Sequence, residues 1–347
     1  MATATVANIP VIDISGNQQQ AAKELVDAAI EHGFIFIKNT GQDIPVEAVD
    51  GAFDLSRKLF SAPVEEKQSC VYQKNNRGWS SMKYETLDPK NQRVGDFKEA
   101  FNFGEFVDGQ AQQPIPPTIA PYEAQICAFR DLCYEMSLRI NTLLGIGLEV
   151  DPPDFFSAAH LREKGASGTI LRLLYYPPLA NTDADREDVR AGAHSDYGSM
   201  TMLFRLKGQA GLEIQTRENT WAPVPVCPPG TENDPAPPIL VNIGDLLSYW
   251  TNGLLRSTVH RVVFPGPGKE VVEGETDTDP RYSMAYFCHP VGTMPLTPVP
   301  SERVRKVNAP ADASAGNPHA ERKVLTADEH LNMRLRASYL QFYKDKE

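Results

Sequence analysis

The sequence has little that would suit a nucleic acid or a membrane. Its 34 Lys and Arg residues are outnumbered by 45 Asp and Glu residues, which gives a formal net charge of −11. Nucleic-acid binding needs clustered Lys and Arg to displace counterions from phosphate, so we set that class aside. No apolar run reaches the roughly 18 residues of a membrane-spanning helix. The start, MATATVANIPVIDIS, lacks the basic end and long apolar stretch of a secretion signal, so we expect a soluble, cytoplasmic protein.

Cysteine is also scarce and irregularly placed. The five cysteines are odd in number, and no two of them have CxxC spacing. This pattern indicates neither a disulfide framework nor a cysteine zinc site, and we expect buried, reduced thiols instead. The residues concerned are Cys70, Cys127, Cys133, Cys227 and Cys288.

Three N-terminal segments carry apolar residues at helical spacing. They predict helices over residues 20–32, 46–60 and 121–144. Gly33 is placed to end the first helix, and a strand, FIFIKN, follows at once. With 41% hydrophobic and 23% charged residues, the composition is that of an ordinary globular protein with a sizeable core.

From about residue 169 the pattern changes to short apolar runs separated by Gly, Pro and Asn clusters. Such a pattern is typical of a sandwich or barrel of antiparallel strands. Asn252-Gly253 predicts a tight turn between two strands, and loops at 180–190, 227–238 and 265–280 are expected at the rim. The predicted strands are residues 169–176, 199–206, 211–215, 239–250, 258–264 and 281–288.

A last helix is predicted where the chain reads TADE. Thr326 can cap it, and Glu329 can act as the capping-box partner. The apolar stripe that would pack this helix on the body consists of Leu331, Leu335, Tyr339 and Phe342.

These patterns predict a mainly β protein with flanking helices. We divide it into an N-terminal helical and mixed region (residues 1–165), a β-rich core (166–295) and a C-terminal extension with a packing helix (296–347). No internal repeat or second independent core is visible in the sequence.

A metal site is indicated by the stretch AGAHSDYGSMTMLF at 191–204. If His194 and Asp196 lie in a strand, they point to the same face and can reach one ion. His260 is the best third ligand because it lies inside an apolar, strand-like run, RSTVHRVVF. Two histidines and one carboxylate form the facial triad of non-heme Fe(II) oxygenases, which leaves coordination positions open for cosubstrate and oxygen.

A carboxylate clamp is indicated by Arg281 and Ser283 in PRYSMAYF, again two residues apart on one strand face. A guanidinium is a planar, two-pronged donor for a carboxylate, and a serine hydroxyl adds a further hydrogen bond. Together they could hold the far end of a dicarboxylate.

These motifs together resemble the 2-oxoglutarate- and Fe(II)-dependent dioxygenases of the isopenicillin N synthase-like group, most closely the fungal-type members. The resemblance extends over most of residues 9–295. It rests on HSD at 194–196, STVHRV at 257–262, RYS at 281–283, IPVIDIS at 9–15, HGFIFIKNTG at 32–41, LRLLYYPP at 171–178 and VNIGDLLSYWTNG at 241–253.

The resemblance implies a distorted double-stranded β-helix, or jelly roll, with Fe(II) inside one open end. His194, Asp196 and His260 would bind the iron. Arg281 and Ser283, supported by Tyr176, would bind the distal carboxylate of 2-oxoglutarate. Many relatives carry Asn where this chain has Leu174, so the surroundings of the cosubstrate are expected to differ here.

The reaction implied is an O2-dependent oxidation of a small organic molecule, with decarboxylation of 2-oxoglutarate to succinate and CO2. Hydroxylation, desaturation, cyclisation and ring expansion are all compatible with this class. Phe287 is the strongest candidate for substrate contact because it shares a strand face with Arg281. The substrate candidates are Arg77, Trp79, Tyr84, Phe101, Arg205, Trp250 and Phe287.

Several alternatives stay open at this point. Fungal secondary metabolism is the expected context, but a nucleobase hydroxylase similar to thymine dioxygenase fits the same motifs. An Fe(II) oxidase of the isopenicillin N synthase type would use the triad without 2-oxoglutarate, and Arg281 could then bind a substrate carboxylate. A catalytically silent metal-binding protein and a zinc hydrolase are more remote. The oligomeric state is left open.

Overall fold

Two β-sheets face each other in the computed structural model, which describes residues 6–178, 189–264, 279–307 and 324–338. The large sheet has the strand order β1-β2-β12-β9-β14-β7-β4-β3 and the small sheet the order β11-β10-β13-β8. The large sheet contains β1 (Val11–Ile12), β2 (Phe34–Ile37), β3 (Gly78–Ser80), β4 (Glu99–Phe103), β7 (Ile170–Tyr176), β9 (Met200–Arg205), β12 (Ile239–Ile243) and β14 (Arg281–Cys288). The small sheet contains β8 (Val189–His194), β10 (Leu212–Gln215), β11 (Trp221–Pro223) and β13 (His260–Val263). A separate hairpin pairs β5 (Phe106–Val107) with β6 (Gln110–Ala111).

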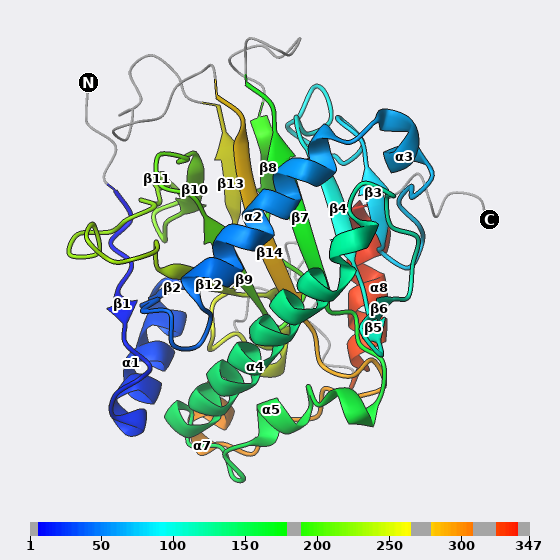
Figure 1. The fold of residues 1–347 in the computed structure, drawn as a ribbon. Helices are drawn as coiled ribbons and strands as arrows, with labels where there is room; N and C mark the ends of the chain where they lie inside the picture. Colours follow the sequence, from blue (N-terminus) through cyan, green and yellow to red (C-terminus); the bar gives the residue numbers. More distant parts are fainter. Residues whose placement is uncertain (1–5, 179–188, 265–278, 308–323, 339–347) are drawn as a thin grey trace.

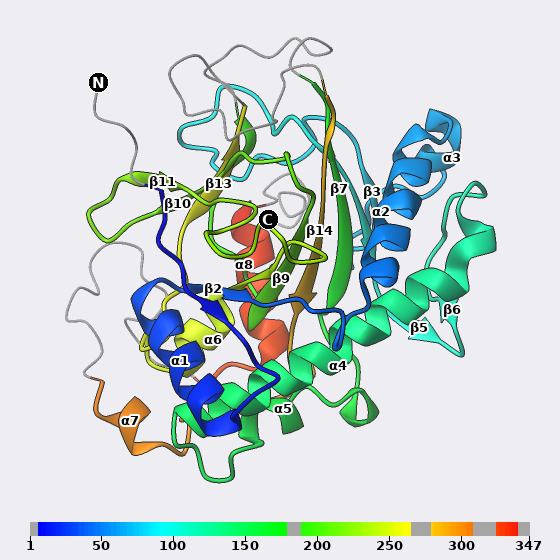
Figure 2. The same ribbon diagram turned by 60° about the vertical axis from the view of Figure 1, so that its left-hand side comes forward.

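The outer face of the large sheet is covered by helices (Figures 1 and 2). The predicted helices are confirmed as α1 (Gln18–Glu31), α2 (Val46–Ser61) and α4 (Glu123–Gly147), and α2 and α4 both contact β14. Gly33 ends the first helix as predicted, with a φ of +67° that suits glycine. The shorter helices are α3 (Val64–Gln68), η1 (Ala120–Tyr122), α5 (Phe155–Ala158), η2 (Arg162–Lys164), α6 (Asp245–Trp250) and α7 (Glu302–Arg305).

The C-terminal helix α8 (Ala327–Ser338) packs against α6 (Figure 2). Its predicted capping box is confirmed, because the Thr326 amide donates to Glu329 Oε2 at 2.8 Å and the Glu329 amide donates to Thr326 Oγ1 at 3.2 Å. Leu331 and Leu335 pack with Tyr72, whereas the predicted continuation of the stripe at Tyr339 and Phe342 lies outside the described residues.

Two apolar layers result from the alternation of side chains along each strand. One fills the space between the large sheet and the helices, and the other lies between the two sheets. On β14, Met284 and Tyr286 face the helices, while Ala285 and Phe287 face the other sheet. The inter-sheet space is therefore lined by the residues of β14 that share a face with Arg281.

The run at 239–250 was wrongly predicted as one strand. It is divided at Gly244 into β12 and α6. A Cβ at Gly244 would come within 2.2 Å of the Gly198 carbonyl oxygen, so only glycine fits this approach. The turn at Asn252-Gly253 is confirmed, with φ values of +58° and +76°, but it follows a helix rather than joining two strands.

Four further predictions concern the N-terminal region, the cysteines, the rim loops and the cellular location. The N-terminal region, read as helical and mixed, places β1 to β4 in the large sheet beside the core strands. All five cysteines are free, and Cys70, Cys133 and Cys288 are buried, whereas the other two are only half-buried. Most of the predicted rim loops at 180–190 and 265–280 lie outside the described residues. None of the described helices is long and apolar enough to cross a bilayer, and the cytoplasmic location stays a prediction.

Candidate active site

Three metal-ligating side chains converge between the two sheets. His194 ends β8 and lies directly opposite His260, the first residue of β13, in the strand register. Asp196 Oδ1 lies 3.7 Å from His194 Nε2 and 3.8 Å from His260 Nε2. The three candidate ligand atoms all lie within 4.8 Å of one another, so a single ion can be reached by all of them.

The strand geometry predicted for His194 and Asp196 is wrong in one respect. Only His194 is in a strand, and Asp196 lies in the connection between β8 and β9. Asp196 is held in place by two hydrogen bonds to Oδ2, from Thr201 Oγ1 on β9 and from Asn242 Nδ2 on β12, both 2.7 Å long. These bonds occupy one carboxylate oxygen and leave Oδ1 facing the histidines.

The charge state of the triad suits a cation. Burial opposes ionisation of Asp196, but the two imidazoles and the two hydrogen bonds outweigh it, so the pKa of the carboxyl lies below its usual value. Burial, aided by the neighbouring His260, lowers the pKa of His194 to about 3. An anionic carboxylate and a neutral imidazole are the forms that bind metal.

Each histidine is also oriented by its own backbone. His194 Nδ1 lies 2.8 Å from the Gly192 carbonyl oxygen, and His260 Nδ1 lies 3.1 Å from the Thr258 carbonyl oxygen. A proton on Nδ1 that is donated to a carbonyl leaves the Nε2 lone pair free for a metal ion.

The predicted carboxylate clamp lies in the same cavity as the triad. Arg281, Ser283 and Tyr176 are buried and line it together with His194, Asp196 and His260. Arg281 Nε donates to the Ala210 carbonyl at 2.8 Å, and its guanidinium lies 4.7 Å from the centre of the Tyr176 ring. Arg281 Nη1 is buried and has no hydrogen-bond partner among the described residues.

An unpartnered buried guanidinium nitrogen needs an acceptor, and a carboxylate supplies one. The donor set of the triad likewise fits Fe(II). The residues present therefore fit both groups that the sequence motifs imply.

Two family models match the chain. One, described as "non-haem dioxygenase in morphine synthesis N-terminal", covers residues 9–123, and the other, the "2OG-Fe(II) oxygenase superfamily", covers residues 167–290. The chain belongs to the 2OG-Fe(II) oxygenase superfamily. The predicted resemblance, enzyme class and double-stranded β-helix fold are thereby confirmed, as is the family's use of Fe(II), 2-oxoglutarate and O2.

Three similar proteins are of fungal origin. "UPF0676 protein C1494.01" of Schizosaccharomyces pombe is 37% identical over 305 residues, which cover 86% of this chain and 87% of that protein. Proline hydroxylase buaE of Petromyces alliaceus is 31% identical, covering 79% of this chain and 83% of its own length. Among solved structures, a full-length Neurospora crassa protein in complex with alpha-KG and thymine has a TM-score of 0.74 at 27% identity, covering 96% of this chain and 99% of that one.

Of the substrate candidates in this oxygenase, Phe287 lines the cavity around the triad. Trp79, Phe101 and Trp250 instead lie in the apolar layer between the large sheet and the helices. The indole nitrogens of Trp79 and Trp250 donate to Glu99 Oε2 and to the Thr297 carbonyl, at 2.9 and 2.8 Å. Trp79 and Phe101 thus lie on the helix-facing side of the large sheet, and Trp250, at the end of α6, packs in the same apolar layer.

The remaining candidates are also placed outside the described lining of this cavity. Arg205 is buried and donates to the carbonyls of Val224 and Pro225, at 3.2 and 2.8 Å. Arg77 packs beside Gly104. Tyr84 packs near Tyr72 in the small cluster under α8, with ring centres 5.8 Å apart.

Several lining residues were not found from the sequence. Arg172, Lys98 and Leu87 line the cavity around the triad. An adjoining outer chamber shares Arg172, Phe287 and the ligands His194 and Asp196 with this cavity, and it is also lined by Leu331 and Leu335 of α8. Arg172 could have been found from the sequence. Residues two positions apart in a strand share a face, and Arg172, Leu174 and Tyr176 have this spacing on β7. Leu87 and Lys98 lie outside any strand and carry no periodic signal.

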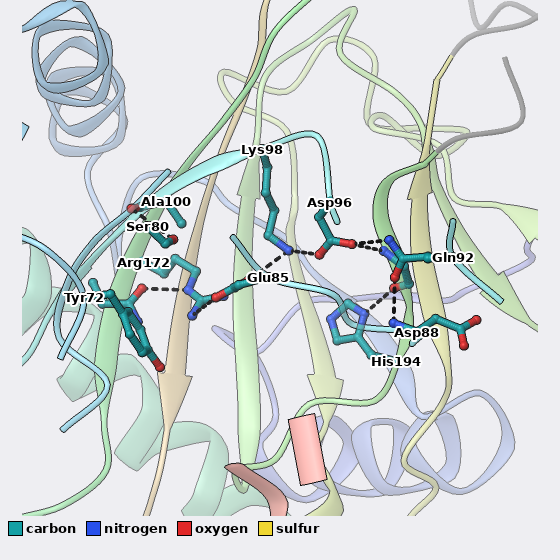
Figure 3. A network of polar contacts seen from close by, with 12 residues as sticks. Tyr72, Ser80, Glu85, Asp88, Gln92, Asp96, Lys98, Ala100, Arg172 and His194 are labelled. Atoms are coloured by element: carbon teal, nitrogen blue, oxygen red, sulfur yellow. Dashed lines mark hydrogen bonds and ion pairs between the residues drawn. The ribbon is translucent and has the colours of Figure 1, made fainter. Parts of the chain in front are cut away.

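Arg172 and Lys98 belong to a buried polar network (Figure 3). Lys98 Nζ contacts Asp96 and lies 2.9 Å from Glu85 Oε2, while Glu85 Oε1 lies 3.1 Å from Arg172 Nη2. Asp96 Oδ1 also accepts from the Gly192 amide at 3.0 Å. The network therefore runs from β7 to the strand that carries His194.

Proposed function

We propose that His194, Asp196 and His260 hold the Fe(II) of this oxygenase. Arg281 and Ser283, with Tyr176 beside them, would hold the distal carboxylate of 2-oxoglutarate. The observation that carries this assignment is the buried Arg281 Nη1, which lacks a described partner and lies in the cavity that contains the triad. A carboxylate at this position would satisfy it.

When bound, iron and 2-oxoglutarate supply with O2 the oxidant that removes hydrogen from a substrate carbon, with succinate and CO2 as products. The side chains of the protein position the metal and the cosubstrate and form the walls around them. Asp196 Oδ1 and the two histidine Nε2 atoms would bind the metal, and Arg281 would orient the cosubstrate in the same cavity. Apolar residues such as Leu174 and Phe287 in the cavity wall exclude water from the reacting groups.

We further propose that the substrate is a small organic molecule of fungal secondary metabolism. Relatives support a small substrate, because one is named a proline hydroxylase and a similar protein was crystallised with thymine. Hydroxylation is the simplest outcome, and desaturation, cyclisation or ring expansion use the same site. Phe287 is the proposed substrate contact.

The test is an anaerobic titration of the metal-free protein with Fe(II) and then 2-oxoglutarate, followed by visible absorption. A charge-transfer band is expected in the wild type, absent in His194→Ala and shifted to higher 2-oxoglutarate concentration in Arg281→Ala. Lys74→Ala, at an exposed position, is the control and should match the wild type.

The outcome separates the alternatives. Iron binding without the band favours an oxidase in which Arg281 binds a substrate carboxylate. Absence of iron binding favours a silent protein or a zinc hydrolase, and contradicts the assignment of the triad.

A further inference from the structure

Four buried charged side chains form a network beside the cavity around the triad, and two of them line it. Arg172 and Lys98 are 9% and 3% exposed, and Glu85 and Asp96 are 3% and 1% exposed. Two cations are thus matched by two anions, joined in the order Arg172, Glu85, Lys98, Asp96 (Figure 3). The set carries no net charge.

The cations and anions occupy different positions relative to the cavity. Arg172 and Lys98 line the cavity around the triad, and Arg172 also lines the outer chamber. Glu85 and Asp96 are absent from the described linings of both and lie behind the two cations. A bound molecule therefore meets N–H donors whose charge is already neutralised.

Several ion pairs and hydrogen bonds hold the side chains of the network in fixed positions. The Arg172 guanidinium is held by Glu85 on two nitrogens, at 3.1 and 3.3 Å, and its Nε donates to Asn102 Oδ1 at 2.7 Å. Buried ion pairs add little stability compared with apolar residues of similar volume. Their fixed geometry suits a preorganised binding surface.

The far end of the network fixes its position relative to the metal ligands. Asp96 Oδ1 accepts from the Gly192 amide at 3.0 Å, and the Gly192 carbonyl lies 2.8 Å from His194 Nδ1. Gln92 Nε2 donates to the same Asp96 oxygen at 2.7 Å. A group bound by Arg172 and Lys98 is therefore held at a set distance from the triad.

The rest of the outer chamber is lined by polar residues, which include Asn76, Ser195 and His289, and by an apolar side. Its apolar lining consists of Leu87, Ile170, Phe287, Leu331 and Leu335. A ligand would therefore place an apolar portion against α8 and Phe287, and a hydrogen-bond acceptor against Arg172 and Lys98.

We propose that the substrate is an uncharged, compact molecule that carries a carbonyl-type acceptor, such as a lactam, amide or pyrimidinedione, beside an apolar portion. This inference rests on the proposed function for the reacting site. A carboxylate is disfavoured because it would have to compete with Glu85 and Asp96 for the same donors and would gain no net attraction.

The experiment compares matched pairs that differ by one carboxylate. Anaerobic protein loaded with Fe(II) and 2-oxoglutarate is titrated calorimetrically with uracil and orotate, and with 2-pyrrolidinone and pyroglutamate. In the wild type, we expect the neutral member of a pair to bind at least about tenfold more tightly than its carboxylate. Preference for the carboxylates, or no binding by either neutral probe, overturns the proposal.

Glu85→Gln gives the sharper test, because it leaves Arg172 and Lys98 with one uncompensated positive charge. The preference should reverse, with the carboxylates gaining about tenfold and the neutral probes changing little. An unchanged preference in a folded Glu85→Gln protein contradicts the proposal.

A second variant covers the case in which Glu85→Gln does not fold. Arg172→Gln should weaken the neutral probes by about tenfold, with Lys74→Ala as the surface control. The absorption band of the loaded protein reports the iron and 2-oxoglutarate assignment separately. A missing band in the wild type therefore refutes the proposed site, whereas a normal band with the wrong probe preference refutes only the substrate class.

Discussion

At the triad, the two oxygens of Asp196 have different partners. Oδ1 faces the histidines, while Oδ2 accepts hydrogen bonds from Asn242 and Thr201. We expect Asn242→Leu to weaken Fe(II) binding by about 10- to 100-fold, since the carboxylate loses a partner that orients it. An anaerobic Fe(II) titration measures this. Thr201→Val removes the other bond and should act in the same direction; a lower stability of both variants with unchanged Fe(II) affinity would show that these bonds serve folding only.

Arg281 offers a second prediction at the residue scale. Arg281→Lys keeps the charge but loses the planar fork, so the half-saturating 2-oxoglutarate concentration should rise by about 10-fold or more while Fe(II) affinity stays unchanged. The concentration dependence of the absorption band gives the value. An equal loss of iron and 2-oxoglutarate binding would contradict the assignment, because it would indicate a general disturbance of the cavity.

A single functional residue can be predicted from the sequence when its chemistry requires a particular side chain. His194 with Asp196, and Arg281 with Ser283, were predicted because metal and carboxylate binding need particular side chains and each pair is spaced two residues apart. His260 was predicted because it is a histidine inside an apolar, strand-like run. Aromatic candidates carry no such requirement, and an aromatic in a strand fits either face of a sheet equally well.

The buried network of Arg172, Glu85, Lys98 and Asp96, by contrast, could not be predicted from the sequence. Glu85 and Lys98 lie 13 positions apart, and Arg172 is 74 positions beyond Lys98. Ion pairs between such distant positions exist only once β4 and β7 are paired, so no local pattern predicts them.

The junction between α1 and β2 permits a test at the element scale. Gly33 has a φ of +67°, and a Cβ there would lie 2.2 Å from the Arg256 carbonyl oxygen. Gly33→Ala should therefore lower the free energy of unfolding by at least about 2 kcal/mol. Gly16→Ala is a matched control, because nothing lies within 4 Å of its Cβ position. Urea unfolding of both variants decides the matter, and equal effects would contradict the role of Gly33.

The cap of α8 links helix stability to the substrate chamber. Thr326→Ala removes one bond of the capping box, which should destabilise the helix locally by about 1 kcal/mol. Amide hydrogen exchange in α8 should accelerate, while 2-oxoglutarate binding is retained because α8 lines only the outer chamber. Thr216→Ala, in a surface turn of the small sheet, is the control. Unchanged exchange in α8 would show that packing alone holds the helix.

Helices were predictable where apolar residues keep helical spacing between clear boundaries, as in α1, α2 and α4. The run at 239–250 failed because a short apolar run suits a buried strand and a buried helix equally. Only the close approach of Gly244 to Gly198, a tertiary contact, divides β12 from α6.

At the scale of the whole molecule, the order of strands was beyond the sequence patterns. β2, β12 and β9 are neighbours in the large sheet although they are far apart in the chain. Their pairing buries apolar faces that many other pairings would also bury, so pattern alone cannot choose among them. The family resemblance supplied the jelly roll instead.

Buried histidines should make the stability of the whole molecule depend on pH. Burial lowers the pKa of His160 to about 4, and its ring nitrogens lie 2.7 Å from the Phe156 carbonyl and 2.9 Å from Ser199 Oγ. The unfolded chain binds a proton at this residue near pH 6.5, whereas the folded protein does so only near pH 4. Stability is therefore lost as the pH falls through this window, by about 1.4 kcal/mol per pH unit for one histidine.

Denaturant unfolding at several pH values, with wild type and His160→Gln compared, isolates this contribution. The variant should be less stable near neutral pH but should lose less stability on acidification, because its buried amide does not titrate. Ser199→Ala keeps the imidazole while removing its hydroxyl partner, so its pH slope should stay close to that of the wild type. If His160→Gln has the same slope as the wild type, other groups carry the acid sensitivity and His160 is not held neutral in the folded protein.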